Sequence, residues 1–343
     1  MTAPEPRANP LLVGHAAREA VLLDALRSGR MHHAWLLAGP SGIGKATLAF
    51  RFARRLLAGV PSEGDTLALD PAHPVFRRVA AGSHADLLTV ERAYDEKRKR
   101  TRTQIAVDDI RKINGFMGLT PAEGGWRVVV VDGAEDMNQN AANALLKVLE
   151  EPPPRAVLLL VCDAPGRLLP TIRSRCRRLR LSPLGEADMD RLLAAYLPDV
   201  AAEERGRLAT LGEGSPGRAL TLAEEEGLRL AGLVDEILGE LPGLRPARGY
   251  EVADALGRSE TAFSTFMDLL RGSLSAAVRE VVRGRGDGEQ ARLVAARPLD
   301  AWGDVWHALT RLQDETERFN LDKRQAILSS LSLLRGRPAS SME

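Results

Sequence analysis

The stretch GPSGIGKAT at residues 39–47 constrains the fold most, because a glycine-rich loop ending in lysine needs a strand before it and a helix after it. The apolar run AWLLA (34–38) precedes the loop, and a helical stretch from Thr47 to Leu57 follows it. In this setting backbone N–H groups and the helix N-terminus cradle phosphate oxygens, and Lys45 adds positive charge. The sequence therefore predicts a phosphate-binding loop.

Further apolar runs predict the other strands of a sheet. They are DLLTV (86–90), RVVVV (127–131), AVLLLV (156–161) and RRLRL (177–181). Helical stretches separate these runs, which is the pattern of a parallel sheet covered by helices. The near-continuous apolar run 128–131 suits a strand buried on both faces. We predict an α/β core at residues 1–181, built on a parallel five-stranded sheet with helices on both faces.

The character of the chain changes after Pro183, where strand-like runs give way to helix-forming Ala, Leu, Arg and Glu. Residues 182–222 are predicted to form a small helical lid containing the turn GEGSPGRAL (212–220). Residues 223–343 are predicted to form an all-α C-terminal domain.

The last predicted helix is DKRQAILSSLSLL (322–334), with Asn320 and Asp322 as candidate caps. The tail GRPASSME (336–343) is expected to be disordered.

Composition excludes several classes of protein. The 343 residues carry 47 Lys and Arg against 46 Asp and Glu, which argues against attachment to nucleic acid or lipid by bulk charge. No apolar run approaches the roughly 20 residues of a membrane-spanning helix, and the N-terminus lacks a basic-then-apolar export pattern. The cysteines, Cys162 and Cys176, give no disulfide framework. We expect a soluble cytoplasmic protein without a membrane partner.

The loop departs from a working nucleotide site at one position. The residue after the lysine is normally Ser or Thr, whose hydroxyl binds Mg²⁺, but here it is Ala46. Thr47 comes one position later, about 100° further round the helix, so we do not expect it to substitute.

A second departure lies in VVVVDGAED (128–136). Asp132, at the end of its strand, is the candidate magnesium ligand, but Gly133 stands where a catalytic Glu would activate water. Glu135 is expected to point elsewhere, as an acid at a helix start. Because both losses affect the same chemistry, efficient ATP hydrolysis is not expected.

Two motifs carry a family resemblance. Asn140 to Pro153 reads NAANALLKVLEEPP, and Ser174, Arg175 and Cys176 form a Ser-Arg-Cys motif. Both resemble the clamp-loader branch of the AAA+ ATPases, over about residues 9–220 and more weakly over the C-terminal helices. Motor subunits of that branch keep Ser or Thr after the lysine and an Asp-Glu pair. A complete Ser-Arg-Cys motif beside a defective ATP site instead resembles a non-motor subunit.

The resemblance implies a subunit of a pentameric, C-shaped complex that opens a sliding clamp and loads it on primed DNA during replication. Its implied partners are motor subunits of the gamma/tau type and a clamp-opening subunit of the delta type, with the sliding clamp and primed DNA reached through the complex. The implied role is a non-hydrolysing stator. Arg175 would be an arginine finger completing a neighbour's ATP site, and the C-terminal helices would form an oligomerising collar.

The candidate nucleotide-binding residues, weak or vestigial, are Gly39, Gly42, Gly44, Lys45, Ala46, Thr47, Asp132 and Arg218. Arg218 resembles the family's second sensor, and it either contacts nucleotide phosphate or only packs the lid against the core. The intact glycines and Lys45 argue that ATP or ADP binds, whereas Ala46 argues that binding is weak. Both alternatives stay open.

Members of this family usually carry four zinc-binding cysteines between the first helix and the second strand. Residues 57–86 of this chain contain none. His73 and His84 are too few ligands for a structural zinc site, so we predict no zinc and no other metal, with both histidines as ordinary polar residues of a loop.

The run EKRKRTR (96–102) is the densest basic cluster. It either contacts DNA phosphates or an acidic partner, or forms a solvated loop between the second strand and the next helix. Two other functions remain to be weighed against the stator. One is an active AAA+ ATPase, either a motor subunit or a DNA-remodelling helicase, and the other is a plain DNA-binding module.

Overall fold

The computed structural model describes residues 4–59, 65–96, 99–224, 227–241, 243–257 and 259–335. The tail 336–343 lies outside the described residues. The chain forms two compact units, Met1–Leu220 and Thr221–Glu343.

The first unit is built on a five-stranded sheet in the order β2-β5-β6-β1-β7, with every pair of neighbours parallel. Its strands are β1 (Ala34–Ala38), β2 (Leu87–Val90), β5 (Arg127–Asp132), β6 (Ala156–Cys162) and β7 (Arg177–Arg180). The central strands β1 and β6 are buried along their whole length, since helices cover both faces. The five predicted strands are confirmed, each to within a residue at either end.

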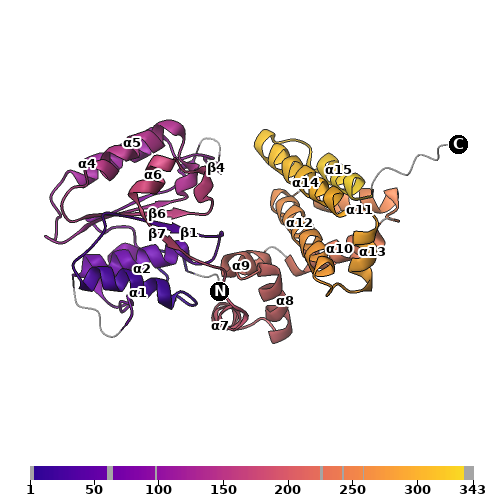
Figure 1. Cartoon of the computed structure of the whole chain (residues 1–343), viewed down its shortest axis with the longest axis horizontal. Helices are drawn as coiled ribbons and strands as arrows, with labels where there is room; N and C mark the ends of the chain where they lie inside the picture. The colour runs from indigo at the N-terminus through magenta and orange to yellow at the C-terminus, as the bar shows by residue number, and fades with distance from the viewer. Residues whose placement is uncertain are drawn as a thin grey trace. The chain divides into compact units, whose positions relative to one another are not determined.

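Helices lie on both sides of this sheet (Figure 1). They are α1 (Ala16–Arg27), α2 (Lys45–Ala58), α3 (Pro74–Ala80), α4 (Val107–Met117), α5 (Gln139–Glu150) and α6 (Pro170–Arg175), with short 3-10 turns η1 (Ala134–Asp136) and η2 (Pro165–Arg167). Helix α2 packs on β1, β5 and β6, and α4, α5 and α6 cover the opposite face. On that face Ile110 and Leu145 join Leu36, Val129 and Leu158 in one buried cluster. The predicted α/β core is confirmed.

The sheet order brings the ends of three strands to one edge. Ala38 at the end of β1 lies opposite Cys162 at the end of β6, and Asp132 at the end of β5 lies opposite Val161. Because the strands are parallel, the segments that follow them share this edge, where ligands of α/β proteins commonly bind. The glycine-rich loop starts there, at Gly39.

The basic run is predicted by one alternative to be a solvated loop, and its described residues Glu96, Lys99, Thr101 and Arg102 are exposed, but the segment also contains paired strands. Strands β3 (Tyr94–Asp95) and β4 (Arg100–Thr101) form an antiparallel pair, with Tyr94 opposite Thr101. Tyr and Thr favour extended backbone, which suits this pairing. Residues 97 and 98 of the run lie outside the described residues.

Helices α7 (Glu186–Tyr196), α8 (Ala202–Gly212) and α9 (Pro216–Glu224) follow the sheet. The predicted turn before α9 is confirmed, since Glu213 and Gly214 both have positive φ, +49° and +79°. Helix α9 runs across the boundary between the two units. A core of 1–181 and a lid of 182–222 stay a predicted subdivision of the first unit.

The second unit is helical wherever the structure describes it. Its helices are α10 (Gly227–Glu240), α11 (Pro246–Leu256), α12 (Glu260–Val282), α13 (Gly288–Ala295), α14 (Leu299–Phe319) and α15 (Lys323–Arg335). Helix α12 contacts α10, α13, α14 and α15, and its Phe263, Phe266 and Leu270 are fully buried. Among the described helices, none combines the length and the apolar character needed to cross a bilayer.

Of the two predicted caps of the last helix, Asp322 is confirmed and Asn320 is not. Asp322 Oδ1 accepts a hydrogen bond from the Gln325 backbone N at 2.8 Å and so caps α15, as predicted. Asn320 does not cap α15. It ends α14 with φ +50° and donates its N–H to Thr316 O, because Asn tolerates the left-handed conformation of a helix C-terminus.

Candidate nucleotide-binding site

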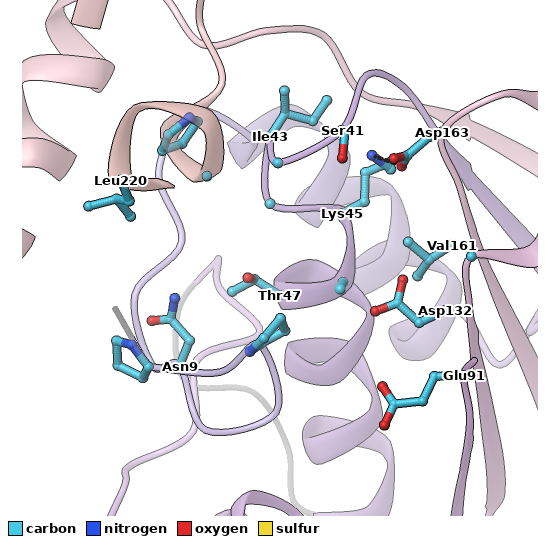
Figure 2. A pocket seen from close by; sticks show the side chains of 18 of the residues that line it. Asn9, Ser41, Ile43, Lys45, Thr47, Glu91, Asp132, Val161, Asp163 and Leu220 are labelled. Carbon is cyan, nitrogen blue, oxygen red and sulfur yellow. Dashed lines mark ion pairs between the residues drawn. The ribbon is translucent and has the colours of Figure 1, made fainter. Parts of the chain in front are cut away.

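A cavity of about 770 Å³ lies at the sheet edge where β5 and β6 end. The glycine-rich loop, the N-terminal segment and α9 contribute to its walls, as Figure 2 shows for Ser41, Asn9 and Leu220. The candidates Gly42, Gly44, Lys45, Ala46, Thr47 and Asp132 all line it, whereas Gly39, Arg218 and the Ser-Arg-Cys motif do not. The structure therefore brings most of the predicted nucleotide-binding residues together.

The loop conformation depends on its glycines. Gly42 and Gly44 have φ values of +72° and +97°, which residues with a side chain rarely adopt. Gly39 donates its N–H to Cys162 O at 3.2 Å, and a Cβ there would collide with the carbonyl oxygen of Leu181. Each glycine is required by the loop itself, whether or not a nucleotide binds.

Lys45, the first residue of α2, is engaged by the protein. Its Nζ lies 2.6 Å from Asp163 Oδ1 and donates to the carbonyl of Pro40, and the side chain is only 3% exposed. The Asp163 carboxylate points at this ammonium in Figure 2. Sequence reasoning missed Asp163, although it directly follows β6 at the edge where the loop lies.

The candidate magnesium ligands do not converge. Asp132 lies in the cavity, and burial, with the nearby charges of Glu91 and Asp163, raises its pKa to about 6. Ala46 lines the cavity but offers no side-chain oxygen. Figure 2 shows Thr47 and Asp132 on opposite sides of the first turn of α2. No hydroxyl therefore faces Asp132 from this turn.

The sequence predicted that Glu135 points away from the site, and this prediction is wrong. It lines the cavity, and its Oε1 accepts a hydrogen bond from the Asp163 backbone N at 2.7 Å. Gly133, with φ +74°, turns the chain into η1 directly after β5, which returns Glu135 to the sheet edge. One oxygen of the carboxylate thereby positions the Asp163 backbone, while Oε2 is buried without a hydrogen-bond partner among the described residues.

Arg218 pairs with Glu213 at 3.1 Å. Its neighbours hold the glycine-rich loop, since Gly217 N donates to Gly42 O and Ser215 Oγ donates to Ser41 O, each at 2.9 Å. The ion pair of Arg218 lies within the lid, so it decides between neither of the two alternatives, and both stay open.

The Ser-Arg-Cys motif lies at the end of α6. Arg175 pairs with Glu150 Oε1 at 2.9 Å and donates to Thr171 O at 3.0 Å, with 36% of its side chain exposed. Ser174 is exposed and donates to Thr171 O. Cys176 belongs to the core, and burial raises the pKa of its thiol to about 12. Arg175 is thus the one charged group that the motif presents at the surface.

The two histidines have structural partners. His73 caps α3 by accepting from Val75 N, and the buried His84 accepts from Asp86 N at 3.2 Å. In the part of the chain that the structure describes, no group of three or more His, Cys, Asp or Glu side chains could hold a metal ion. That this protein binds no zinc stays a prediction.

Buried arginines of α2 fix the N-terminal wall, and sequence reasoning missed them. Arg54 donates to the carbonyls of Arg7 and Asn9 at 2.9 and 2.8 Å, and Arg51 pairs with Glu19 at 2.7 Å. Burial lowers the pKa of Arg54 to about 10. The signal in the sequence that could have indicated these buried arginines is their position among the apolar residues of the helix.

Comparison with known proteins gives a consistent set of matches. The family model described as DNA polymerase III, delta subunit, matches residues 14–185. DNA polymerase III subunit delta' of Pseudomonas aeruginosa is 44% identical over 184 residues, 54% of this chain and 53% of that protein. The Escherichia coli delta' subunit is 34% identical over 203 residues, 59% and 57% of the two chains. The matched region spans about half the length of these curated relatives.

A motor-type relative and a solved structure also match. Escherichia coli subunit tau is 32% identical over 219 residues, 62% of this chain and 32% of that protein. A Thermotoga maritima crystal structure, of a protein related to the DNA polymerase III gamma subunit, is 20% identical with a TM-score of 0.47, covering 92% of this chain and 98% of that one.

Proposed function

Because this chain belongs to the DNA polymerase III delta-subunit family, we propose that it is a non-hydrolysing subunit of a clamp-loader complex. In that role it helps to place a sliding clamp on primed DNA, in the cytoplasm of a bacterial cell. Its partners are motor subunits of the gamma/tau type and a clamp-opening subunit of the delta type. It reaches the clamp and the DNA through the complex.

The cavity supports the absence of hydrolysis. Ala46 supplies no magnesium ligand, and Thr47 faces away from Asp132. Gly133 has no carboxylate, and Glu135 is engaged by the Asp163 backbone. Phosphoryl transfer needs both charge neutralisation by metal and an oriented nucleophile. The isolated protein should therefore hydrolyse ATP no faster than background.

Arg175 is the residue that we propose to act, in trans, on the ATP of a neighbouring motor subunit. The observation that carries this proposal is its position at the end of α6, partly exposed and outside its own cavity. A guanidinium is permanently charged and suits the transferring phosphoryl group. An exposed ion pair contributes little stability. The Arg175 side chain can therefore leave Glu150 and bind a phosphate of a neighbouring subunit at little cost.

The test is Arg175→Ala in a complex reconstituted with motor, clamp-opening and clamp proteins. Fold and assembly should be unchanged, whereas ATP hydrolysis and clamp loading should fall. A finger contributes on the order of 10³-fold at the site it serves, but other sites keep their own fingers, so the total rate should fall partially. Arg175→Lys should rescue poorly, because an ammonium cannot make the bidentate contact.

Arg178→Ala is the matched control, since it removes an exposed arginine from the adjacent strand β7. It should leave both rates unchanged. Equal rates for wild type and Arg175→Ala at matched assembly would remove the finger role. Steady hydrolysis by the isolated chain that disappears in Lys45→Ala would instead support an active ATPase.

A further inference from the structure

We propose that Asp163 is an internal ligand of the glycine-rich loop. It takes the place of a nucleotide phosphate on Lys45, and it makes the cavity exclude nucleoside di- and triphosphates. This inference concerns the chain's own cavity and rests neither on Arg175 nor on the clamp-loader role.

The Asp163 carboxylate occupies the ammonium group that a nucleotide phosphate would use. A phosphate-loop lysine binds nucleotide through its ammonium group, and here that ammonium lies 2.6 Å from a carboxylate and donates to the Pro40 carbonyl. Since Lys45 is 3% exposed, an entering phosphate cannot reach it without displacing Asp163. A buried ammonium also needs a counter-charge, which Asp163 supplies.

The position of Asp163 is itself fixed. Its backbone follows β6, and its N–H donates to Glu135 Oε1 at 2.7 Å. The loop on the other side is held by the lid, through the hydrogen bonds from Gly217 to Gly42 and from Ser215 to Ser41. The backbone on both sides of the ion pair is therefore anchored without a nucleotide, while the Asp163 carboxylate itself is 42% exposed.

Charge around the pair opposes a second anion. Among the described residues, five carboxylates line the cavity, Glu91, Asp132, Glu135, Asp136 and Asp163, against the cations Lys45 and Arg92. Arg92 Nε lies 3.4 Å from Asp136 Oδ2. The carboxylate of Asp136 therefore already offsets part of the positive charge of Arg92. The five carboxylates are half-buried or exposed, so water screens part of their repulsion, and the rest still opposes a further anion. A magnesium ion would offset this repulsion, but Ala46 provides no ligand for it.

The experiment measures nucleotide binding by the isolated full-length protein, with MgADP and MgATP titrated by calorimetry. Wild type should show no saturable binding up to about 1 mM. Asp163→Asn keeps the shape of the side chain but removes its charge, so Lys45 becomes available. This variant should bind MgADP at least about tenfold more tightly than wild type, roughly the effect of one charge-assisted hydrogen bond.

Two controls separate the direct contact from the general charge. Glu91→Gln also removes one cavity carboxylate, but Glu91 makes no ion pair with Lys45 among the described contacts, so it should give a smaller gain. Adding Lys45→Met to Asp163→Asn should abolish the gain. Thermal melting of each variant establishes that it is folded.

Micromolar binding of MgADP by wild type would overturn the proposal, even if Asp163→Asn failed to fold. Equal affinities for Asp163→Asn and Glu91→Gln would also overturn it, because bulk charge would then explain the effect. Neither result bears on the reconstituted Arg175→Ala assay, so failure of this inference is distinguishable from failure of the proposed function.

Discussion

Single residues of the cavity carry charge into a partly buried site, and Asp132 illustrates what this costs the fold. Burial raises its pKa from 3.8 to about 6, and Glu91 and Asp163 add to the effect. Between these two values the folded state binds the proton more tightly than the unfolded state. Ionisation of Asp132 therefore destabilises the folded protein as the pH rises through 6.

Asp132→Asn should accordingly stabilise the protein at neutral pH, because it removes this charge. The pKa difference corresponds to at most about 3 kcal/mol, so a gain of roughly 1–3 kcal/mol in the free energy of unfolding is expected at pH 7.5. The gain should shrink below pH 6 and nearly vanish at pH 4, where the carboxyl is neutral in both states. Denaturant titrations at several pH values measure it.

The exposed Asp190 on α7 provides a control. Asp190→Asn should change the free energy of unfolding by less than about 0.5 kcal/mol at any of these pH values. A loss of stability at pH 7.5 in Asp132→Asn would mean that the carboxylate has a stabilising partner instead.

At the level of helices and strands, local pattern predicted most of the core. The five strands were found because each is a short apolar run bounded by polar or turn residues. The glycine-rich loop was found because Gly39, Gly44 and Lys45 stand at fixed spacing. These features depend on neighbours in the sequence, so one chain suffices to predict them.

Long-range pairing and backbone twists were not predictable in the same way. The Lys45–Asp163 pair joins residues that only the parallel pairing of β1 with β6 brings together. Glu135 was misplaced because the left-handed conformation of Gly133 redirects the chain. Asn320 was assigned to the wrong helix end, since Asn suits both a helix start and a left-handed stop.

The contact between α9 and the glycine-rich loop gives a prediction about these elements. A Cβ at Gly217 would lie 2.8 Å from Gly42 Cα, so Gly217→Ala should push the helix off the loop. We expect a loss of about 1–3 kcal/mol in stability. Amide exchange should accelerate at Gly217 N and at nearby loop amides, measured by hydrogen–deuterium exchange.

Gly206→Ala on α8 is the matched control, because a Cβ there meets nothing within 4 Å. The change should stabilise the protein by up to about 1 kcal/mol, through better helix propensity. Unchanged exchange at the loop in Gly217→Ala would show that the lid does not hold the loop in solution.

For the whole molecule, the division into two units separates the cavity and Arg175 from the C-terminal helices. The second unit has its own core, with Phe263 and Phe266 fully buried on α12. It also exposes apolar side chains at the turn from α14 to α15, where Phe319 is 62% and Leu321 48% exposed. Exposed apolar side chains at one place mark a candidate contact surface, and we propose that these helices form the collar that the family resemblance implies.

A chain truncated after Glu224 tests this division of roles. The cut keeps α9 whole, whereas a cut at the unit boundary after Leu220 would remove its last turn and loosen the lid. The fragment should fold cooperatively, because the first unit retains its complete sheet and both helical layers. It should nonetheless fail to co-purify with motor and clamp-opening subunits. Full-length Arg175→Ala is the control that must still assemble, and full assembly of the fragment would place the binding surface in the first unit.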